Sequence, residues 1–158
     1  MKKMMSRFGE IEYDPRKTIH FPDGLIGFED LHDFVVVPSG KEGPLFWIQS
    51  VDDPQIAFVL TDPTNFFLDY KVVPDETERD RLGITDKDEC LSLSVVTVHR
   101  DKSVTLNLQA PIIFAPAKNK ALQVILEKTK YESRTPLPSV NPAASQGKKS
   151  KNEATATR

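Results

Sequence analysis

Short apolar runs separated by turn residues repeat from residue 9 to about residue 131, and they limit the possible folds more than any other feature. The clearest is Leu91–Val98, where apolar and polar residues alternate with the period of two that turns one face of a β-strand toward a core. A hairpin-length connection, 99–103, joins it to a second run at 104–108. We expect strands at 9–13, 18–21, 34–38, 45–51, 56–61, 68–73, 91–100, 104–109, 112–115 and 121–126.

Helix signals are scarce by comparison. Residues 74–83 begin with proline and acidic residues, carry arginine near their end and finish on glycine, which predicts one short helix. Residues 27–32 are a candidate for one further helical turn. The predicted fold is therefore mainly β: a small antiparallel β-barrel, or a barrel-like sandwich, in one domain that covers residues 1–136.

The C-terminal segment, residues 137–158, has a different composition. It has no aromatic residue and is rich in Ser, Ala, Lys and Asn, and Pro138 and Pro142 interrupt it. Such a segment buries too little apolar area to offset its ordering entropy, so we expect a disordered basic tail.

The single cysteine, Cys90, cannot form an internal disulfide, which suits a reducing compartment. The first eight residues are positively charged but have no apolar segment behind them, unlike a signal peptide. The longest apolar runs, such as 34–37, are too short to cross a bilayer. We expect a cytoplasmic protein that makes no membrane contact.

Charge is concentrated in the middle of the chain. Residues 52–90 carry eleven carboxylates against four cations, a net charge of −7. This balance argues against nucleic acid as a direct partner, because phosphate binding needs a contiguous basic face, and it favours a basic protein partner. The alternative is a solvated acidic surface that only aids solubility. The carboxylates are Asp52, Asp53, Asp62, Asp69, Asp75, Glu76, Glu78, Asp80, Asp86, Asp88 and Glu89; the cations are Lys71, Arg79, Arg81 and Lys87.

Two of these carboxylates occupy a turn between the strands expected at 45–51 and 56–61. Pro54 fixes its own φ and favours an extended Asp53, while Asp52 and Asp53 can accept bonds from nearby backbone. An acidic turn on a strand pair indicates a recognition surface rather than an active site.

The segment 21–28 is a second candidate surface. Gly24 can take a positive φ in the turn that Pro22 begins, and Gly27 allows another tight reversal. Its apolar side chains either plug the barrel or form an apolar rim for a partner's helix or extended peptide. They are Phe21, Leu25, Ile26 and Phe28.

Catalytic and metal-binding motifs are missing from the sequence. His20, His32 and His99 fall on different expected elements without zinc-ligand spacing, and no phosphate loop or nucleophile elbow occurs, so we expect no metal or cofactor. One enzymatic alternative is a small acidic hydrolase that uses paired carboxylates, Asp52 with Asp53 or Asp75 with Glu76. An oligonucleotide-binding barrel is disfavoured because the strands lack a basic face with stacking aromatics.

Three segments, 21–28, 46–58 and 105–113, resemble in order the bacterial flagellar assembly factor FliW family, and 123–126 resembles the closing strand of that family. The sequence departs from the family at Phe114 and Ala115, where a polar Asn is more usual. The positions that match family motifs are Phe21, Gly24, Leu25, Gly27, Phe28, Gln49, Ser50, Pro54, Phe58, Asn107, Leu108, Ala110 and Pro111.

The resemblance implies a small β-barrel protein without catalysis. Proteins of this kind bind flagellin in the cytoplasm and alternatively bind the RNA-binding translational repressor CsrA. Once flagellin is exported, the freed factor occupies CsrA and relieves repression of flagellin synthesis.

The resemblance also suggests which side chains would contact each partner. CsrA must be basic to hold RNA, so carboxylates of the acidic segment would face it, whereas the amphipathic terminal segments of flagellin suit exposed apolar side chains. The CsrA candidates are Asp52, Asp53, Asp62, Asp69, Asp75 and Glu76. The flagellin candidates are Phe28, Phe66, Phe67 and Tyr70.

Overall fold

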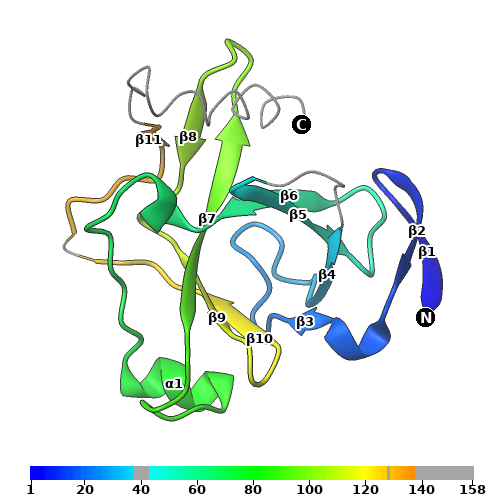
Figure 1. The fold of residues 1–158 in the computed structure, drawn as a ribbon, viewed down its shortest axis with the longest axis horizontal. Coiled ribbons are helices and arrows are strands. Elements are labelled where there is room, and N and C mark those ends of the chain that lie inside the picture. Colours follow the sequence, from blue (N-terminus) through cyan, green and yellow to red (C-terminus); the bar gives the residue numbers. More distant parts are fainter. Residues whose placement is uncertain (38–42, 128, 138–158) are drawn as a thin grey trace.

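A nine-stranded sheet closes on itself into a ring (Figure 1). The computed structural model describes residues 1–37, 43–127 and 129–137. The sheet order is β11-β8-β7-β6-β5-β4-β3-β10-β9, and the ring closes because β7 pairs with β9 as well as with β6 and β8. The strands are β1 (Lys2–Ser6), β2 (Gly9–Tyr13), β3 (Ile19–His20), β4 (Asp33–Val37), β5 (Leu45–Ser50), β6 (Ala57–Thr61), β7 (Leu91–Val98), β8 (Val104–Leu106), β9 (Ile112–Ala115), β10 (Lys120–Gln123) and β11 (Thr135–Pro136).

The ring confirms the predicted mainly β fold class, but the expectation of a purely antiparallel sheet is wrong at one seam. There β3 and β10 run parallel, with Lys120 opposite His20. A short turn forces its two strands to be antiparallel, whereas β3 and β10 lie about a hundred residues apart, so no turn sets their direction. The sheet is therefore mixed.

Alternate side chains of the ring strands point into and out of the ring, as the pleat requires. On β5, Ile48 lies in the core cluster inside the ring and Trp47 lies in a second cluster outside it. The inner cluster comprises Phe21, Leu25, Phe34, Ile48, Leu60, Ile112 and Ala121. The outer cluster comprises Val37, Trp47, Val59, Tyr70, Val96, Leu106 and Leu108.

The segment 21–28 plugs the ring and also leaves an apolar rim. Phe21 and Leu25 are buried in the inner cluster, while Ile26 is 52% exposed and Phe28 is 36% exposed. Gly24 has a φ of +68°, and a Cβ there would lie 2.5 Å from the carbonyl oxygen of Phe28, so only glycine fits. Both alternatives left open by the sequence therefore describe part of this loop.

The predicted helix is present as α1 (Glu76–Leu82), below the ring in Figure 1. Asp75 caps it through a reciprocal pair of bonds: its carboxylate accepts from the backbone N–H of Glu78 at 2.8 Å, and the Glu78 carboxylate accepts from the N–H of Asp75 at 2.9 Å. Gly83 ends the helix with a φ of +74°, and Leu82 is fully buried beneath it.

The strand expected at 68–73 is wrong. Leu68 is 87% exposed, and the N–H of Tyr70 donates to the carbonyl of Phe67 at 3.0 Å, which makes a turn. The apolar residues there pack individually against the outer cluster instead of alternating across a sheet.

The further helical turn expected at 27–32 is also wrong. The segment consists of turns. The N–H of Phe28 donates to the carbonyl of Leu25 at 2.7 Å, inside an isolated antiparallel bridge between these two residues.

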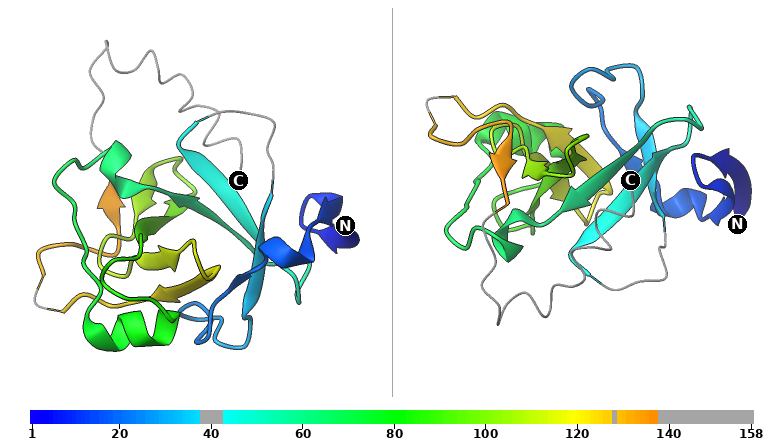
Figure 2. Two further views of the ribbon diagram at one scale, coloured as in Figure 1. Left: turned by 60° about the horizontal axis from the view of Figure 1, so that its bottom comes forward. Right: turned by 90° about the horizontal axis from the view of Figure 1, so that it is seen from above.

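Two strands were not predicted. The first, β1, pairs with β2 in a hairpin that stands to one side of the ring in Figures 1 and 2, where the ring of Phe8 meets Trp47 edge-on at 4.9 Å. The second, β11, pairs with β8, and the N–H of Leu137 still donates to the carbonyl of Val104 at 3.2 Å. The remainder of the predicted tail, 138–158, lies outside the described residues.

Candidate partner-binding surfaces

The acidic turn between β5 and β6 is held from inside by a buried serine. The hydroxyl oxygen of Ser50 accepts from the backbone N–H of Asp52 at 3.1 Å and of Asp53 at 2.9 Å. The Asp53 carboxylate in turn accepts from the N–H of Gln55 at 3.0 Å, so it serves its own turn. Asp52 is exposed and has no ion pair or side-chain hydrogen bond among the described residues. Asp52 is thus the more available of the two charges.

Gln49 ties the same turn to the β1–β2 hairpin. Its amide nitrogen lies within hydrogen-bond distance of three carbonyl oxygens, those of Ser50 at 3.0 Å and of Asp53 and Pro54 at 3.2 Å each. Its amide oxygen accepts from the N–H of Arg7 at 3.0 Å, and the whole side chain is buried. From the sequence, Gln49 was only a motif position, although an amide inside an apolar strand is a signal that it holds backbone together.

Two further candidate carboxylates serve as helix caps. Asp62 precedes the 3₁₀ turn Pro63–Asn65, and its carboxylate accepts from the N–H of Thr64 at 2.9 Å and from the hydroxyl of Thr64 at 2.7 Å. Asp75 caps α1 as described above. Asp69 and Glu76 are exposed.

The structure does not bring the six candidate carboxylates together. Asp52 and Asp53 lie before β6 and Asp62 lies after it. The four steps between the first and last of its five residues, at about 3.3 Å each, separate its ends by roughly 13 Å. Asp75 and Glu76 lie at the start of α1, at another edge of the molecule (Figure 1). The acidic segment is therefore several surfaces rather than one.

Of the four aromatic candidates, Phe28 is the one that lies on the plugging loop, where its ring meets Phe58 edge-on at 5.2 Å. Phe66 and Phe67 are half-buried against the outer cluster. Tyr70 is only 4% exposed, so the expectation that it is an exposed apolar residue is wrong. Its hydroxyl donates to the carbonyl of Leu108 at 2.8 Å, and burial raises the pKa of Tyr70.

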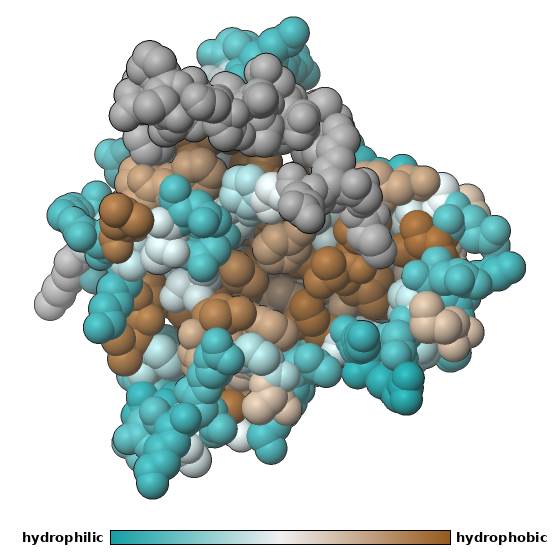
Figure 3. Space-filling model, in the orientation of Figure 1, coloured by the Kyte–Doolittle hydropathy of each residue, from teal (hydrophilic) through white to brown (hydrophobic). Residues whose placement is uncertain are grey.

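Apolar surface gathers around a hollow at the centre of the face in Figure 3, over the interior of the ring. Several half-buried hydrophobic side chains pack on the inner cluster, and we call their exposed parts, together with Phe28, the ring hollow. These side chains are Ile19, Leu31, Phe46, Phe58, Leu93, Val95 and Phe114.

The family-motif residues after β8 also support backbone. The Asn107 side-chain oxygen accepts from the N–H of Ala110 at 2.9 Å, and the Asn107 carbonyl accepts from the hydroxyl of Ser94 at 2.7 Å. Ala110, Pro111 and Leu108 are buried, and the carbonyl of Pro111 accepts from the N–H of Val124 at 2.9 Å. These positions hold the backbone of the ring in place.

Two carboxylates among the described residues have a shifted pKa. The carboxylates with a resolved shift are Asp14 and Asp101, and both shift downward: hydrogen bonds from Arg16 lower the pKa of Asp14 to about 2, and hydrogen bonds from Ser103 lower that of Asp101. A general acid needs the opposite shift. Within the described residues, no three potential metal ligands converge, and no helix is long and apolar enough to cross a membrane.

The ring and its loops define a class of small, mainly β proteins built on one closed, mixed sheet. The FliW protein family matches residues 2–137, and the chain belongs to that family. It is 65% identical over 137 residues to the flagellar assembly factor FliW of Syntrophotalea carbinolica, covering 87% of this chain and 98% of that protein. It is 56% identical to flagellar assembly factor FliW 2 of Desulfotalea psychrophila, covering 89% and 93%. A crystal structure of the flagellar assembly factor FliW superposes with a TM-score of 0.79 at 30% identity, covering 87% of this chain and 97% of the other.

Membership of this family confirms the resemblance drawn from the three motif segments. It also confirms the prediction of a protein that is not an enzyme, and the acidic hydrolase is set aside.

Proposed function

We propose that this chain is a cytoplasmic chaperone for flagellin that alternatively binds CsrA, blocks its RNA binding and so relieves repression of flagellin translation. The observation that carries the proposal is the family match, which spans residues 2–137 and so includes both the acidic turn and the ring hollow. Each surface fits one of the two partners.

The acidic turn suits CsrA. A basic RNA groove attracts carboxylates, and an exposed Asp52 held within a Debye length of about 8–10 Å would repel incoming RNA without filling the groove. A hundredfold loss of RNA affinity needs about 2.7 kcal/mol of coupling, which lies within the usual range for linked sites. The buried support from Gln49 and Ser50 lets the turn present this charge without first being ordered.

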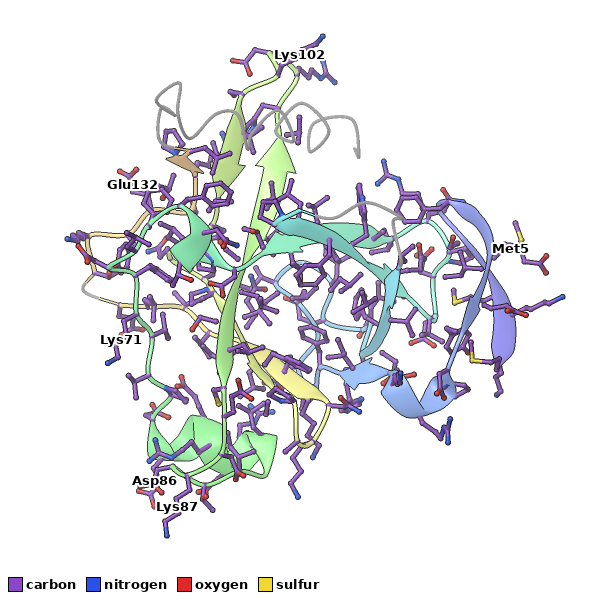
Figure 4. The ribbon with its side chains drawn as sticks, viewed as in Figure 1. Met5, Lys71, Asp86, Lys87, Lys102 and Glu132 are labelled. Carbon is purple, nitrogen blue, oxygen red and sulfur yellow. The ribbon has the colours of Figure 1, made fainter. Side chains whose placement is uncertain are left out.

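The test is Asp52→Lys, titrated against CsrA at low and at moderate salt. Asp53 is left unchanged because its carboxylate serves the turn. We expect affinity to fall about tenfold at low salt and less at moderate salt, mainly through slower association. The control is Glu132→Lys, an exposed carboxylate that lies elsewhere in Figure 4. Equal affinities and equal salt slopes for the two variants would remove the acidic turn from the CsrA contact.

The ring hollow suits flagellin. An amphipathic helix of unassembled flagellin would lay its apolar face on Phe28 and the half-buried side chains around it. Phe66 and Phe67 stay predicted contacts, but they pack against the outer cluster and not on the hollow; the burial of Tyr70 leaves it no surface to offer.

The test is Phe28→Ser, with flagellin binding measured by calorimetry on protein shown to be folded by circular dichroism. We expect at least a tenfold loss of affinity, as for a partly desolvated aromatic anchor. The control is Met5→Ser, which removes a 59% exposed apolar side chain from β1, well away from the hollow in Figure 4. Normal flagellin binding by a folded Phe28→Ser protein would exclude the hollow.

A further inference from the structure

The β7–β8 hairpin extends beyond the ring and ends in a cluster of cations. Arg100 and Lys102 lie in its tip, and Figure 4 places Lys102 at the end of the molecule opposite to Lys87 and α1. The backbone of the tip is fixed, since the N–H of His99 donates to the carbonyl of Ser103 at 2.8 Å and the N–H of Lys102 donates back to His99 at 2.9 Å.

A third cation joins the tip from a distant part of the sequence. The pairing of β11 with β8 sets Pro136 opposite Thr105, and Arg134 lies in the turn that directly precedes β11. There Arg134 lines an open depression of about 460 Å³ together with Arg100 and Thr105. We call Arg100, Lys102 and Arg134 the basic tip.

Among the described residues, Asp101 forms no ion pair with these cations. Asp101 also lines the depression, but its carboxylate accepts from the N–H of Ser103 at 2.9 Å and from the hydroxyl of Ser103 at 2.6 Å. The ion pairs found in the part of the chain that the structure describes do not include any residue of the basic tip. The three cations are exposed and available to an external anion.

We propose that the basic tip binds a carboxylate-rich peptide segment of a protein partner. The guanidinium groups of Arg100 and Arg134 line one depression, where each can receive a carboxylate with paired N–H donors. The basic tip is positively charged, whereas the acidic turn is negatively charged. The basic tip would therefore bind an acidic surface, unlike the acidic turn, which would bind a basic one. It does not depend on the proposed binding of CsrA or flagellin.

A nucleic acid fits this site less well. Polyanion binding draws on a contiguous basic stripe, whereas the tip holds three cations beside Asp101 and Glu132. The segment 52–90, with its net charge of −7, would repel a long phosphate backbone but not a short peptide held at the far end.

The experiment is a titration of the full chain with a hexaglutamate peptide at low salt, followed by amide chemical shifts. We expect the shifts to map to 99–103 and Arg134, and binding to weaken at least tenfold in Arg100→Glu with Arg134→Glu. The matched control, Lys71→Glu with Lys87→Glu, makes the same charge change at exposed lysines elsewhere in Figure 4 and should weaken binding less than twofold.

Three results would overturn the proposal. They are no binding of hexaglutamate by the unchanged protein, equal losses in the two double variants, and binding of a hexanucleotide at least as tight as that of the peptide. Circular dichroism confirms folding of each variant before it is titrated. If the arginine variant does not fold, Lys102→Glu at the exposed tip replaces it, with Lys87→Glu as its control and at least a threefold loss expected.

Discussion

Replacing Gln49 with leucine tests whether one buried amide holds the acidic turn in place. The substitution keeps the size of the side chain but removes the donor to the carbonyls of the turn and the acceptor for the N–H of Arg7. Gln49 is fully buried, so water cannot enter freely to replace these bonds.

The loss of stability depends on which hydrogen-bond partners of Gln49 are left without any other partner. The carbonyl of Asp53 keeps a bond from the N–H of Ile56 at 3.1 Å, and Pro54 is exposed, so its carbonyl can turn to water. The N–H of Arg7 loses its acceptor in a partly buried place, which costs about 1–3 kcal/mol, and the other lost bonds add about 1 kcal/mol. We therefore expect the free energy of unfolding to fall by about 2–4 kcal/mol.

Urea denaturation followed by tryptophan fluorescence measures this loss of stability. Trp47 is a suitable probe because it precedes Gln49 by two positions in β5 and packs against Phe8 of the β1–β2 hairpin. At about 2–4 °C per kcal/mol for a chain of this size, Tm should fall by about 4–16 °C. Gln55→Leu is the control, because it makes the same chemical change at an exposed side chain of the same turn and should cost less than about 0.5 kcal/mol. If both variants unfold at the same urea concentration, the amide does not hold the turn.

Three more outcomes are expected. Gly24→Ala should lose about 3–4 kcal/mol of unfolding free energy, because its Cβ would meet the Phe28 carbonyl; Gly27→Ala, with a φ of +88° and open space, should lose only about 1–2 kcal/mol in the same urea assay. Tyr70→Phe should lower the unfolding free energy by about 1–2 kcal/mol by orphaning the Leu108 carbonyl, and an unchanged Tm would contradict this. Because burial raises the pKa of Tyr70, the unfolded chain releases its proton first, so stability should fall as pH rises above about 10, and Tyr70→Phe should flatten that decline.

The parts of the fold that could be predicted from the sequence are those set by local pattern. The alternation in 91–98 and the turn residues around it located β7 and β8, and the acidic start and glycine end of 74–83 located α1. Both the β7–β8 hairpin and α1 are formed by residues that are close in the sequence, so the local sequence pattern was sufficient to predict them.

The elements that were missed depend on contacts across the chain. The strand β11 has two residues and exists because β8 offers it an edge, and the parallel seam depends on one pair, Lys120 with His20. The apolar residues of 68–73 have strand-like composition, but the hydroxyl of Tyr70 bonds to Leu108 and the segment turns to follow it. Tertiary contacts outweigh β-propensity in such segments.

The candidate sites likewise depend on long-range contacts that the sequence pattern does not show. A count of charges along the sequence assigned Asp52, Asp62 and Asp75 to one acidic segment. Such a count gives no information on the length of β6 or the position of α1, which separate these residues in space. It also missed the basic tip, whose Arg100 and Arg134 meet only after β11 has paired.

Most of the motif residues lie inside the protein, which explains why the family was easier to infer than its surfaces; Phe28 is a motif position that is also a proposed flagellin contact. Gln49, Ser50 and Asn107 are internal: their side chains satisfy backbone groups where strands end, so the ring requires these residue types at these places. Exposed residues such as Asp52 and Arg100 satisfy nothing inside the protein, so the fold tolerates other residues there. Partner choice can then change through exposed charges while the buried supports keep each turn in the same position.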